Sequence, residues 1–519
     1  MLDYLIKNGL IVDGSGAEPF ESNIGIINDK IAYIGREEPC SNVVINANDL
    51  IVSPGFIDVH SHSEFTILAD SRCQAKISQG ITTEINGNCG LSAAPLYKEA
   101  MEYREVDLKE FGIKERWTEF REYFGILKDK GIALNFATLC GHGNIRASVI
   151  GYENKMPDES QIAEMKRLLL NSLNDGAKGL STGLIYPPGI YSDTEELIEL
   201  CRSLNSSHIY TSHMRCEGDR LIESIAEVIR IGREGNVKVH ISHIKISGDN
   251  NWHKIKEVIN LLDDAKRSGV NLTCDAYPYT AASTDLDTIL PSWVYEGGIS
   301  MEIKRLIDPM TRNRVIEFLN HKHEDYWQGV YISNVTKSKN KWMEGKSISE
   351  IATKLNKRAT DLVVDLLVDE RARIGAIFFL MREDNLKSFL SLPYVMIGSD
   401  SSSRSFSGPT YLGKPHPRGF GSFPRFIGKY VRDEGLISLP EAIRRITSLP
   451  SETFRLQGRG LIKEGFFADI TVFDYNNIID KATYNDPFIK PEGIRYVFVN
   501  GQVAYRDGEF TGSLSGAVI

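Results

Sequence analysis

The sequence predicts an α/β protein: a (β/α)8 TIM-like barrel, a small β-sandwich built from both termini, and a lid-like subdomain inserted before strand eight. Three observations support this prediction. Through the middle of the chain, short apolar segments alternate with longer segments of helical periodicity. Eight of the short segments end in polar residues, as the strands of such barrels do. The first fifty and last seventy residues instead read as strands separated by Asn-Gly and Asp-Gly turns.

The elements follow in order along the chain. Residues 1–52 and 452–519 are predicted to form the β domain, and residues 53–284 and 350–451 the barrel. ESQIAEMKRLLLNSLND and LIESIAEVIRIGREG are two of the expected helices between strands. An open, doubly wound sheet is the competing layout, but no Gly-x-Gly-x-x-Gly follows a strand. The eight predicted barrel strands are GFIDVHSH, GITTEING, ALNFATLCG, AKGLSTGLI, HIYTSHMR, VKVHISHIK, VNLTCDAYPY and YVMIGSD.

The segment between the seventh and eighth strands is much too long for one helix. We interpret residues 285–349 as a subdomain over the barrel mouth, because long insertions in compact domains are usually lids or binding loops. Its basic stretch, 337–341, is expected to be a solvated surface rather than a nucleic-acid patch.

Composition excludes several classes of function. The 519 residues include 60 Lys and Arg against 69 Asp and Glu, a net charge of −9 that argues against broad nucleic-acid binding. The longest apolar run, 374–381, is far shorter than the ~20 residues of a membrane helix. We find no secretory signal, and the seven scattered cysteines suggest no disulfide framework. We therefore expect a cytoplasmic enzyme with a small-molecule substrate and no nucleic-acid or membrane partner; the sequence predicts no oligomeric state.

Side chains that bind metals stand at several strand ends. His60 and His62 close the first strand two residues apart, so both point to the same face. Barrel strands end on one rim, where these side chains would converge. Zinc takes His, Cys and Asp ligands, and a binuclear site needs about six of them. The candidate ligands are His60, His62, Cys89, His213, His243 and Asp400.

Three other polar residues, His240, Asp275 and His142, are not among the candidate ligands. His240 has the opposite parity to His243 on the sixth strand and is expected to face the helices as a core histidine. Asp275 is expected to make a structural hydrogen bond. For His142, past the third strand, lining the pocket and bonding within its loop remain equally open.

A family resemblance rests on PGFIDVHSH, GITTEINGNCGLSAAPL, STGLIYPPG, SHMRCEGDRL, SHIK, DAYPYTAAST, GSD and HPRGFGSFPR. These segments resemble the motifs of the D-aminoacylases, the N-acyl-D-amino-acid deacylases of the amidohydrolase superfamily, over nearly the whole chain. The resemblance implies that Cys89, His213 and His243 hold one tight zinc ion. It also implies a second, weaker metal position framed by His60, His62 and Asp400.

One departure from the wider superfamily concerns the fourth strand. Many binuclear relatives bridge their metals there with a carboxylated lysine, whereas Ser181 stands at that place here. Lys178 is offset and poorly placed for the task. We expect the Cys89 thiolate to supply the missing negative charge.

The implied reaction is hydrolysis of the amide bond of N-acyl-D-amino acids by metal-activated water, giving a carboxylic acid and a free D-amino acid. Asp400 is the candidate general base and acid. The α-carboxylate of the substrate needs a cation. Lys245 shares the parity of His243, and Arg418 offers a planar two-donor fork. By resemblance, Lys245, Tyr277, Ser283 and Arg418 hold this carboxylate and Tyr186 lines the pocket.

Other readings stay open. A hydantoin-type cyclic amide hydrolase, or a peptidase acting on unusual or D-amino-acid linkages, would use the same metals. A non-catalytic binding protein is disfavoured because all six candidate ligands are present. The loop 401–415 is longer and richer in Ser and Gly than the family pattern, so a bulkier or different substrate is expected, with Arg404 or Lys414 as alternatives to Arg418.

Overall fold

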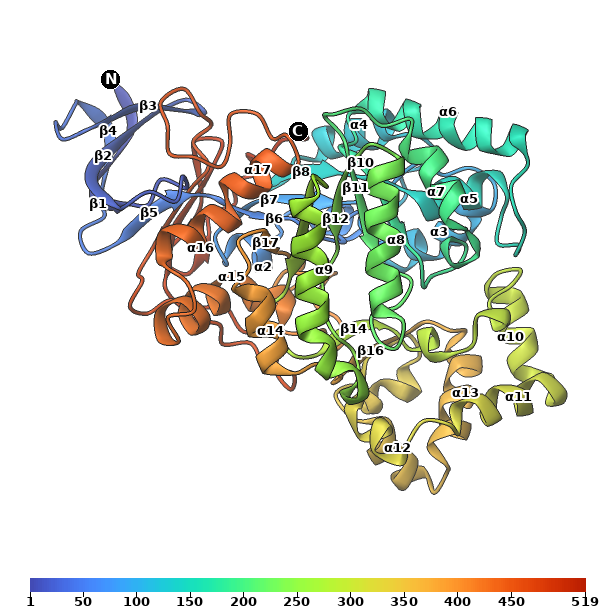
Figure 1. Ribbon diagram of the computed structural model, residues 1–519. Coiled ribbons are helices and arrows are strands. Elements are labelled where there is room, and N and C mark those ends of the chain that lie inside the picture. Colours follow the sequence, from blue (N-terminus) through green and yellow to red (C-terminus); the bar gives the residue numbers. More distant parts are fainter.

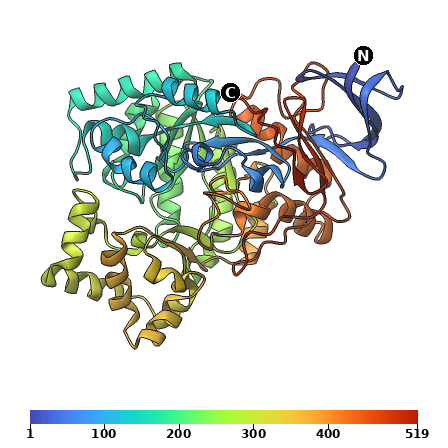
Figure 2. The same ribbon diagram turned by 180° about the vertical axis from the view of Figure 1, so that it is seen from behind.

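The computed structural model describes residues 1–519 and divides into three regions (Figure 1). A β-sheet that contains the N-terminus lies on one side and the barrel with its helices lies in the middle. A helical region, α10 to α13, projects from the barrel; Figure 2 shows the same arrangement from behind. None of the helices combines the length and the hydropathy that a membrane-spanning helix requires.

Strands from both ends of the chain pair in one nine-stranded sheet. Its order is β21-β20-β19-β18-β5-β1-β2-β3, and β4 pairs with β1. The antiparallel pairing of β5 with β18 joins the two ends of the chain, and 13 buried apolar side chains form the core of this region. The predicted β domain built from both termini is therefore confirmed. The strands are β1 Leu2–Ile11, β2 Phe20–Ile27, β3 Lys30–Gly35, β4 Ser41–Asn46, β5 Ile51–Pro54, β18 Ile470–Phe473, β19 Ile494–Val499, β20 Gln502–Arg506 and β21 Glu509–Phe510.

All eight predicted barrel strands are present and pair in parallel. They form two sheets, β6-β7-β8 and β17-β13-β12-β11-β10-β9. The chain runs directly from β8 into β9, and a parallel bridge between Ser61 and Ser401 joins the other two edges, so the barrel closes. The strands are β6 Phe56–Asp58, β7 Ile81–Asn86, β8 Asn135–Thr138, β9 Cys140–Gly141, β10 Gly179–Gly183, β11 Ile209–His213, β12 Lys238–Ile241, β13 Leu272–Ala276 and β17 Val395–Ile397.

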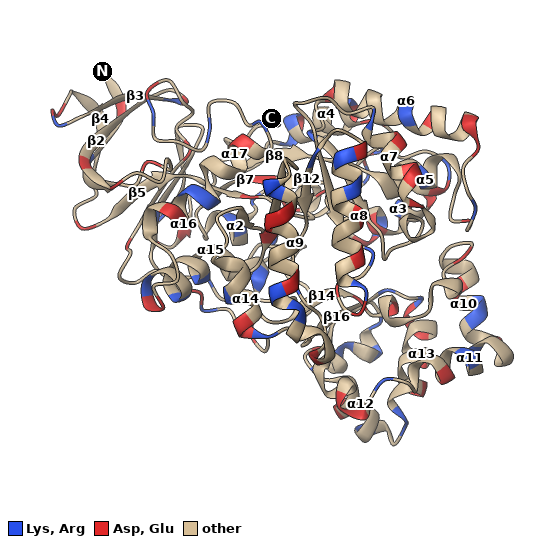
Figure 3. Ribbon diagram, in the orientation of Figure 1, with Lys and Arg blue, Asp and Glu red and all other residues tan.

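Helices surround the barrel, as the apolar periodicity predicts. The two expected helices appear as α6, which begins with a capping box at Asp158 and Gln161, and α8. In Figure 3 basic and acidic residues are interspersed along α8 and α9, as expected for solvated helix faces. The helices outside the insertion are α1 Thr66–Ala69, α2 Gln74–Ile77, α3 Glu99–Glu110, α4 Phe120–Lys130, α5 His142–Val149, α6 Glu159–Asp175, α7 Thr194–Cys201, α8 Leu221–Glu234, α9 Ile255–Arg267, α14 Glu383–Leu390, α15 Arg418–Arg425, α16 Leu439–Ile446 and α17 Ser448–Thr453.

The region between the last two barrel strands has its own sheet and core. Three antiparallel strands, in the order β14-β16-β15, pack with four helices around 25 buried apolar residues that run from Leu286 to Phe378. This core extends beyond residue 349, where the predicted insertion ends; the domain limits themselves stay a prediction. The elements are β14 Ala282–Asp285, α10 Ile299–Ile307, α11 Pro309–Leu319, β15 Val330–Val335, α12 Ile348–Leu355, α13 Ala359–Glu370 and β16 Ile374–Phe378.

The basic stretch of this region is paired with acidic side chains. Lys337 and Lys339 contact Asp369 at 2.8 and 2.9 Å, and Lys341 contacts Glu344 at 2.7 Å. These lysines therefore take part in local surface ion pairs, which fits the expectation of a solvated face.

Candidate metal centre and substrate cavity

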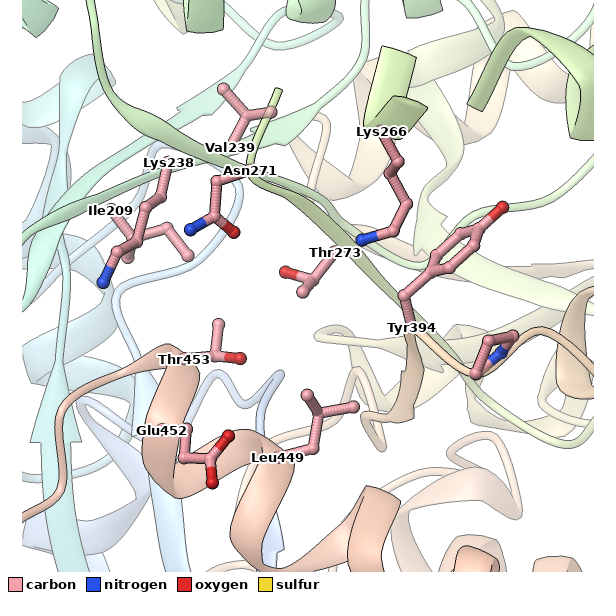
Figure 4. Close-up of a pocket in the computed structure, with 11 residues that line it drawn as sticks. Ile209, Lys238, Val239, Lys266, Asn271, Thr273, Tyr394, Leu449, Glu452 and Thr453 are labelled. Atoms are coloured by element: carbon pink, nitrogen blue, oxygen red, sulfur yellow. The ribbon is translucent and has the colours of Figure 1, made fainter. Parts of the chain in front are cut away.

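Two cavities lie at opposite ends of the barrel. The larger, about 550 Å³, opens at the carboxyl ends of the strands and is also lined by the insertion. The smaller, about 390 Å³, lies at the amino ends of the strands, where Lys238 and Thr273 face Glu452 of α17 (Figure 4). No His or Cys lines the smaller cavity. The candidate chemistry therefore belongs to the larger one, as expected for this kind of barrel.

Cys89 lies at the centre of the predicted ligands. Its Sγ is 3.3 Å from Nε2 of His60 and 3.4 Å from Nε2 of His243. The ring centroids of His213 and His243 are 4.4 Å apart. Burial alone would raise the pKa of the Cys89 thiol, but His60 and His243 hold it well below its usual range. This environment favours a thiolate, the form in which cysteine binds metals.

The ligand atoms fall into two groups that share Cys89. In each of the triads His60–His62–Cys89 and Cys89–His213–His243, the ligand atoms lie within 4.8 Å of one another. His213 is buried, yet neither of its ring nitrogens has a hydrogen-bond partner. Buried polar atoms are rarely left without a partner, so an ion coordinated by His213 would account for this one. The donor set of thiolate and imidazoles suits zinc.

Asp400 connects the histidines to a buried arginine. One carboxylate oxygen, Oδ1, lies 3.2 Å from Nε2 of His62 and 3.6 Å from Nε2 of His60. The other, Oδ2, lies 2.9 Å from Nη1 of Arg418. Burial would raise the pKa of Asp400, but Arg418 and the histidines hold it well below its usual range. Asp400 is therefore an ionised carboxylate at the edge of the metal-ligand cluster.

Behind the cluster, Asp275 fixes two histidine rings. Its Oδ2 lies 3.2 Å from Nδ1 of His60 and 2.8 Å from Nε2 of His240. The predicted structural hydrogen bond is thus present, and it orients a candidate ligand. His240 is a buried core histidine, as predicted, but the predicted orientation of its ring is wrong. Its ring contacts Asp275 and Thr273 inside the barrel instead of facing the helices.

The reason lies in the backbone after β12. The strand ends at Ile241, and His243 has a left-handed φ of 35°, so strand parity does not extend to His243 or Lys245. Cys89 (φ 54°) and Asp400 (φ 48°) are also left-handed. Non-glycine residues adopt this conformation infrequently, and three of the candidate ligands do so here.

Lys245 lines the cavity but already has a partner. Its Nζ contacts Glu217 and lies 2.8 Å from Nδ1 of His243. Glu217 is also 3.0 Å from that Nδ1. Burial would raise the pKa of Glu217, but Lys245 and His213 hold it well below its usual range. Sequence reasoning missed Glu217, although its position four residues after His213 offered a signal.

The other predicted substrate residues also line this cavity. Arg418 stacks 4.6 Å from the ring centroid of Tyr277, and its Nη2 donates to the Ser283 carbonyl at 3.1 Å. Lys245 lies 5.9 Å from the same ring. Tyr186 stands 5.0 Å from the His213 ring and its hydroxyl lies 2.8 Å from that of Thr284. The structure thus brings both predicted cations to one aromatic ring beside Asp400.

Ser181 supports the loop that carries Cys89. Its hydroxyl donates to the Gly87 carbonyl and accepts from the Gly90 amide at 3.1 Å. Lys178 precedes β10, at the opposite end of that strand from the cluster. Ser181 has no amine, and Lys178 lies too far from the ligands to bridge metals. Both facts agree with the predicted departure from the wider superfamily.

The long loop 401–415 borders the cavity. Arg404 lines it, whereas Lys414 donates to the Asn485 carbonyl at 2.8 Å outside it. His142 does not line the cavity; its Nε2 lies 2.7 Å from Glu196 of α7. Arg404 is therefore the only one of the two predicted alternatives to Arg418 that lines the cavity.

Known proteins resemble this chain along its full length. Residues 43–505 match the family model described as the amidohydrolase family. The chain is 35% identical to D-aminoacylase from Alcaligenes xylosoxydans xylosoxydans, covering 100% of this chain and 97% of the relative. A crystal structure of D-aminoacylase superposes with a TM-score of 0.84 at 34% identity, covering 100% and 99%. The N-acyl-D-glutamate deacylase of Bordetella bronchiseptica, solved with zinc and a phosphonate inhibitor, gives 0.85 at 31% identity, with coverage of 100% and 99%.

Proposed function

The chain belongs to the amidohydrolase family and, within it, to the D-aminoacylases, and we propose that it hydrolyses N-acyl-D-amino acids with the help of zinc. The products are a carboxylic acid and a free D-amino acid. One observation carries the proposal: the Cys89–His213–His243 triad, with its unpartnered His213, opens on the same cavity as Asp400 and Arg418. A metal-ligand set, a carboxylate and a cation are thereby available to one substrate.

Zinc would be held tightly by Cys89, His213 and His243. His60, His62 and Asp400 would frame a second, weaker position, with the Cys89 sulfur close to both. When bound, zinc supplies a Lewis acid that activates water and polarises the acyl carbonyl.

Asp400 is the residue proposed to move the proton. Arg418 fixes Oδ2, so Oδ1 is directed toward His60 and His62 at the ligand cluster. This oxygen accepts the proton of the attacking water and then donates it to the departing amide nitrogen. A carboxylate held on one side by a guanidinium keeps its orientation through both transfers.

Arg418 and Lys245 are proposed to bind the α-carboxylate of the substrate beside Tyr277 and Ser283. Both cations approach the Tyr277 ring, and a carboxylate placed there would lie next to Asp400. Tyr186, against His213, would line the pocket on the acyl side.

The catalytic assignment is tested with Asp400→Asn. With N-acetyl-D-leucine as substrate, kcat should fall by roughly 10²- to 10⁴-fold, the usual loss when a general acid–base is removed. Zinc content, measured by mass spectrometry, should retain at least the tight ion held by the Cys89 triad. Full turnover with zinc bound would show that Asp400 is not the base.

The carboxylate site is tested with Arg418→Ala. KM for N-acetyl-D-leucine should rise roughly tenfold or more, since charged hydrogen bonds contribute about 1.5–3 kcal/mol, while KM for the amidated analogue should change little. Arg425→Ala is the matched control, because Arg425 lies on the same helix but contacts Asp480 and does not line the cavity. Because Arg418 also orients Asp400, kcat should fall for both substrates, and only an equal rise of KM for both would contradict the carboxylate role. L-isomers, hydantoins and D-dipeptides complete the panel, and preferential turnover of one of these would replace the proposed substrate class.

A further inference from the structure

The substrate cavity extends from the histidine–cysteine cluster to the insertion, where three carboxyl side chains line it. Asp285 ends β14, Asp287 follows in the next turn, and Glu302 lies in the first turn of α10. Asp285 is exposed to the cavity, whereas Glu302 is buried, with 2% of its surface exposed. We call these three residues the distal carboxyl trio.

No cation of the protein pairs with the trio. The two arginines that line this end, Arg104 and Arg373, are both engaged by helix α3. Asp107 lies 2.9 Å from Arg104 and 3.0 Å from Arg373, and Glu110 also contacts Arg373. The trio forms no ion pair, and Oε1 of Glu302 is buried without any hydrogen-bond partner.

Leaving a buried carboxyl unpaired costs free energy. Glu302 is the buried carboxyl of the trio. Its burial, and then the negative charge of Asp285, raise its pKa to about 8. Asp285 is open to the cavity, but the cavity walls partly desolvate its carboxyl; this desolvation, followed by the charge of Asp107, raises its pKa to about 6. A positive charge delivered from the cavity would remove the penalty.

The geometry favours an organic cation over a metal ion. Groups of three His, Cys, Asp or Glu residues with ligand atoms within 4.8 Å of one another occur only around Cys89, so the trio does not form a chelating set. An ammonium or guanidinium carries several donors and can contact carboxylates that lie farther apart.

We propose that the distal carboxyl trio binds a positively charged ammonium or guanidinium group of the substrate, and that the enzyme prefers N-acyl-D-amino acids carrying such a group. This inference rests on the proposed function, since it names the substrate class of the same cavity. The cation belongs to the amino-acid side chain or to the acyl group, because both extend from the scissile amide.

The test compares kcat/KM for matched substrate pairs. N-acetyl-D-lysine is paired with N-acetyl-D-norleucine, and N-(4-aminobutanoyl)-D-leucine with N-pentanoyl-D-leucine. In one of the two pairs the cationic member should be at least tenfold better, and that pair identifies which part of the substrate carries the charge. Equal kcat/KM within both pairs, or a preference for the neutral members, would overturn the inference while leaving the proposed function standing. No turnover of any of the four substrates would instead refute the proposed function.

Variants of the distal carboxyl trio test whether these residues cause the preference for cationic substrates. Glu302→Gln and Asp285→Asn should each reduce the cationic preference at least fivefold while changing kcat/KM for the neutral member less than twofold. Glu296→Gln is the control, because Glu296 lies near the start of the same helix, is exposed and does not line the cavity. Both substitutions preserve side-chain shape, and Glu302→Gln removes an unpaired carboxyl, so its melting temperature should not fall. An unchanged preference in both trio variants would show that the cation binds elsewhere and overturn the inference.

Discussion

Lys76 lies beneath the candidate metal centre, where the first and last barrel strands meet. Its side chain is completely buried. The ammonium lies 2.6 Å from Asp58 and 3.0 Å from Glu84, and it donates to the hydroxyls of Ser61 at 2.6 Å and Ser399 at 2.8 Å. Burial would lower the pKa of Lys76, but Asp58 and Glu84 raise it. One lysine is therefore the shared counter-ion of two buried carboxylates at the closure of the barrel.

Lys76→Met should strongly destabilise the protein. The substitution keeps a side chain of similar length but leaves Asp58 and Glu84 buried without a counter-ion. Removing one partner of a buried ion pair usually costs about 3–5 kcal/mol, and two carboxylates are affected here. Asp58 also accepts from the amides of His60 at 3.2 Å and Ser399 at 2.8 Å, so its disturbance should reach a candidate ligand.

The assay is denaturant unfolding, together with zinc content. Lys7→Met is the matched control, because Lys7 pairs with Glu38 at 3.2 Å on the surface and its loss should cost at most about 1 kcal/mol. Adding Asp58→Asn and Glu84→Gln to Lys76→Met should restore part of the lost stability, since the unpaired charges are then gone. If the Lys76 and Lys7 variants unfold at the same denaturant concentration, buried charge compensation is not what stabilises this closure.

Three further predictions concern other charged groups and the metal. Burial would raise the pKa of Glu196, but His142 and Arg146 hold it below its usual range, so its stabilising effect is present above pH ~4.3 and is lost as the pH falls. Stability of the wild type should therefore fall more steeply between about pH 5 and 3 than that of Glu196→Gln; parallel curves would contradict this. Arg373→Met removes the ion pairs between the insertion and α3 and should speed hydrogen exchange in residues 282–378, leaving exchange in the barrel strands unchanged. Chelation should abolish hydrolysis, and zinc should restore it in the wild type but not in Cys89→Ser; full activity of chelated protein would contradict the zinc proposal.

The barrel was predictable because its signal is repeated and local. Each of the eight strands is a short apolar segment, and all but the last follow the preceding strand after a helix or loop; the eighth follows the insertion. The sheet of the insertion gave no such signal. Its edge strand β14, Ala282–Asp285, is polar, and it pairs with β16 about ninety residues away, so only the folded chain reveals it.

In the candidate site, too, some features could be predicted from the sequence and others could not. Residues such as His60 and His213 stand at strand ends, and the barrel topology alone brings strand ends to one rim. The orientation of His240 could not be derived from the alternation of side chains relative to His243, because the strand ends before His243. Lys245 lines the cavity as predicted, but not for the predicted reason, because the alternation of side chains along β12 does not extend to it.

Pairing of charges is the property least accessible to the sequence. The net charge of −9 says that acidic side chains outnumber basic ones, but not which of them lack partners. Asp107 has two arginines, one of them 266 residues away, whereas Glu302 has none. That difference arises only when α3 and the insertion meet over the cavity. The unpaired carboxyls of an acidic protein are therefore most informative where they are buried, since there the lack of a partner is costly enough to suggest a ligand.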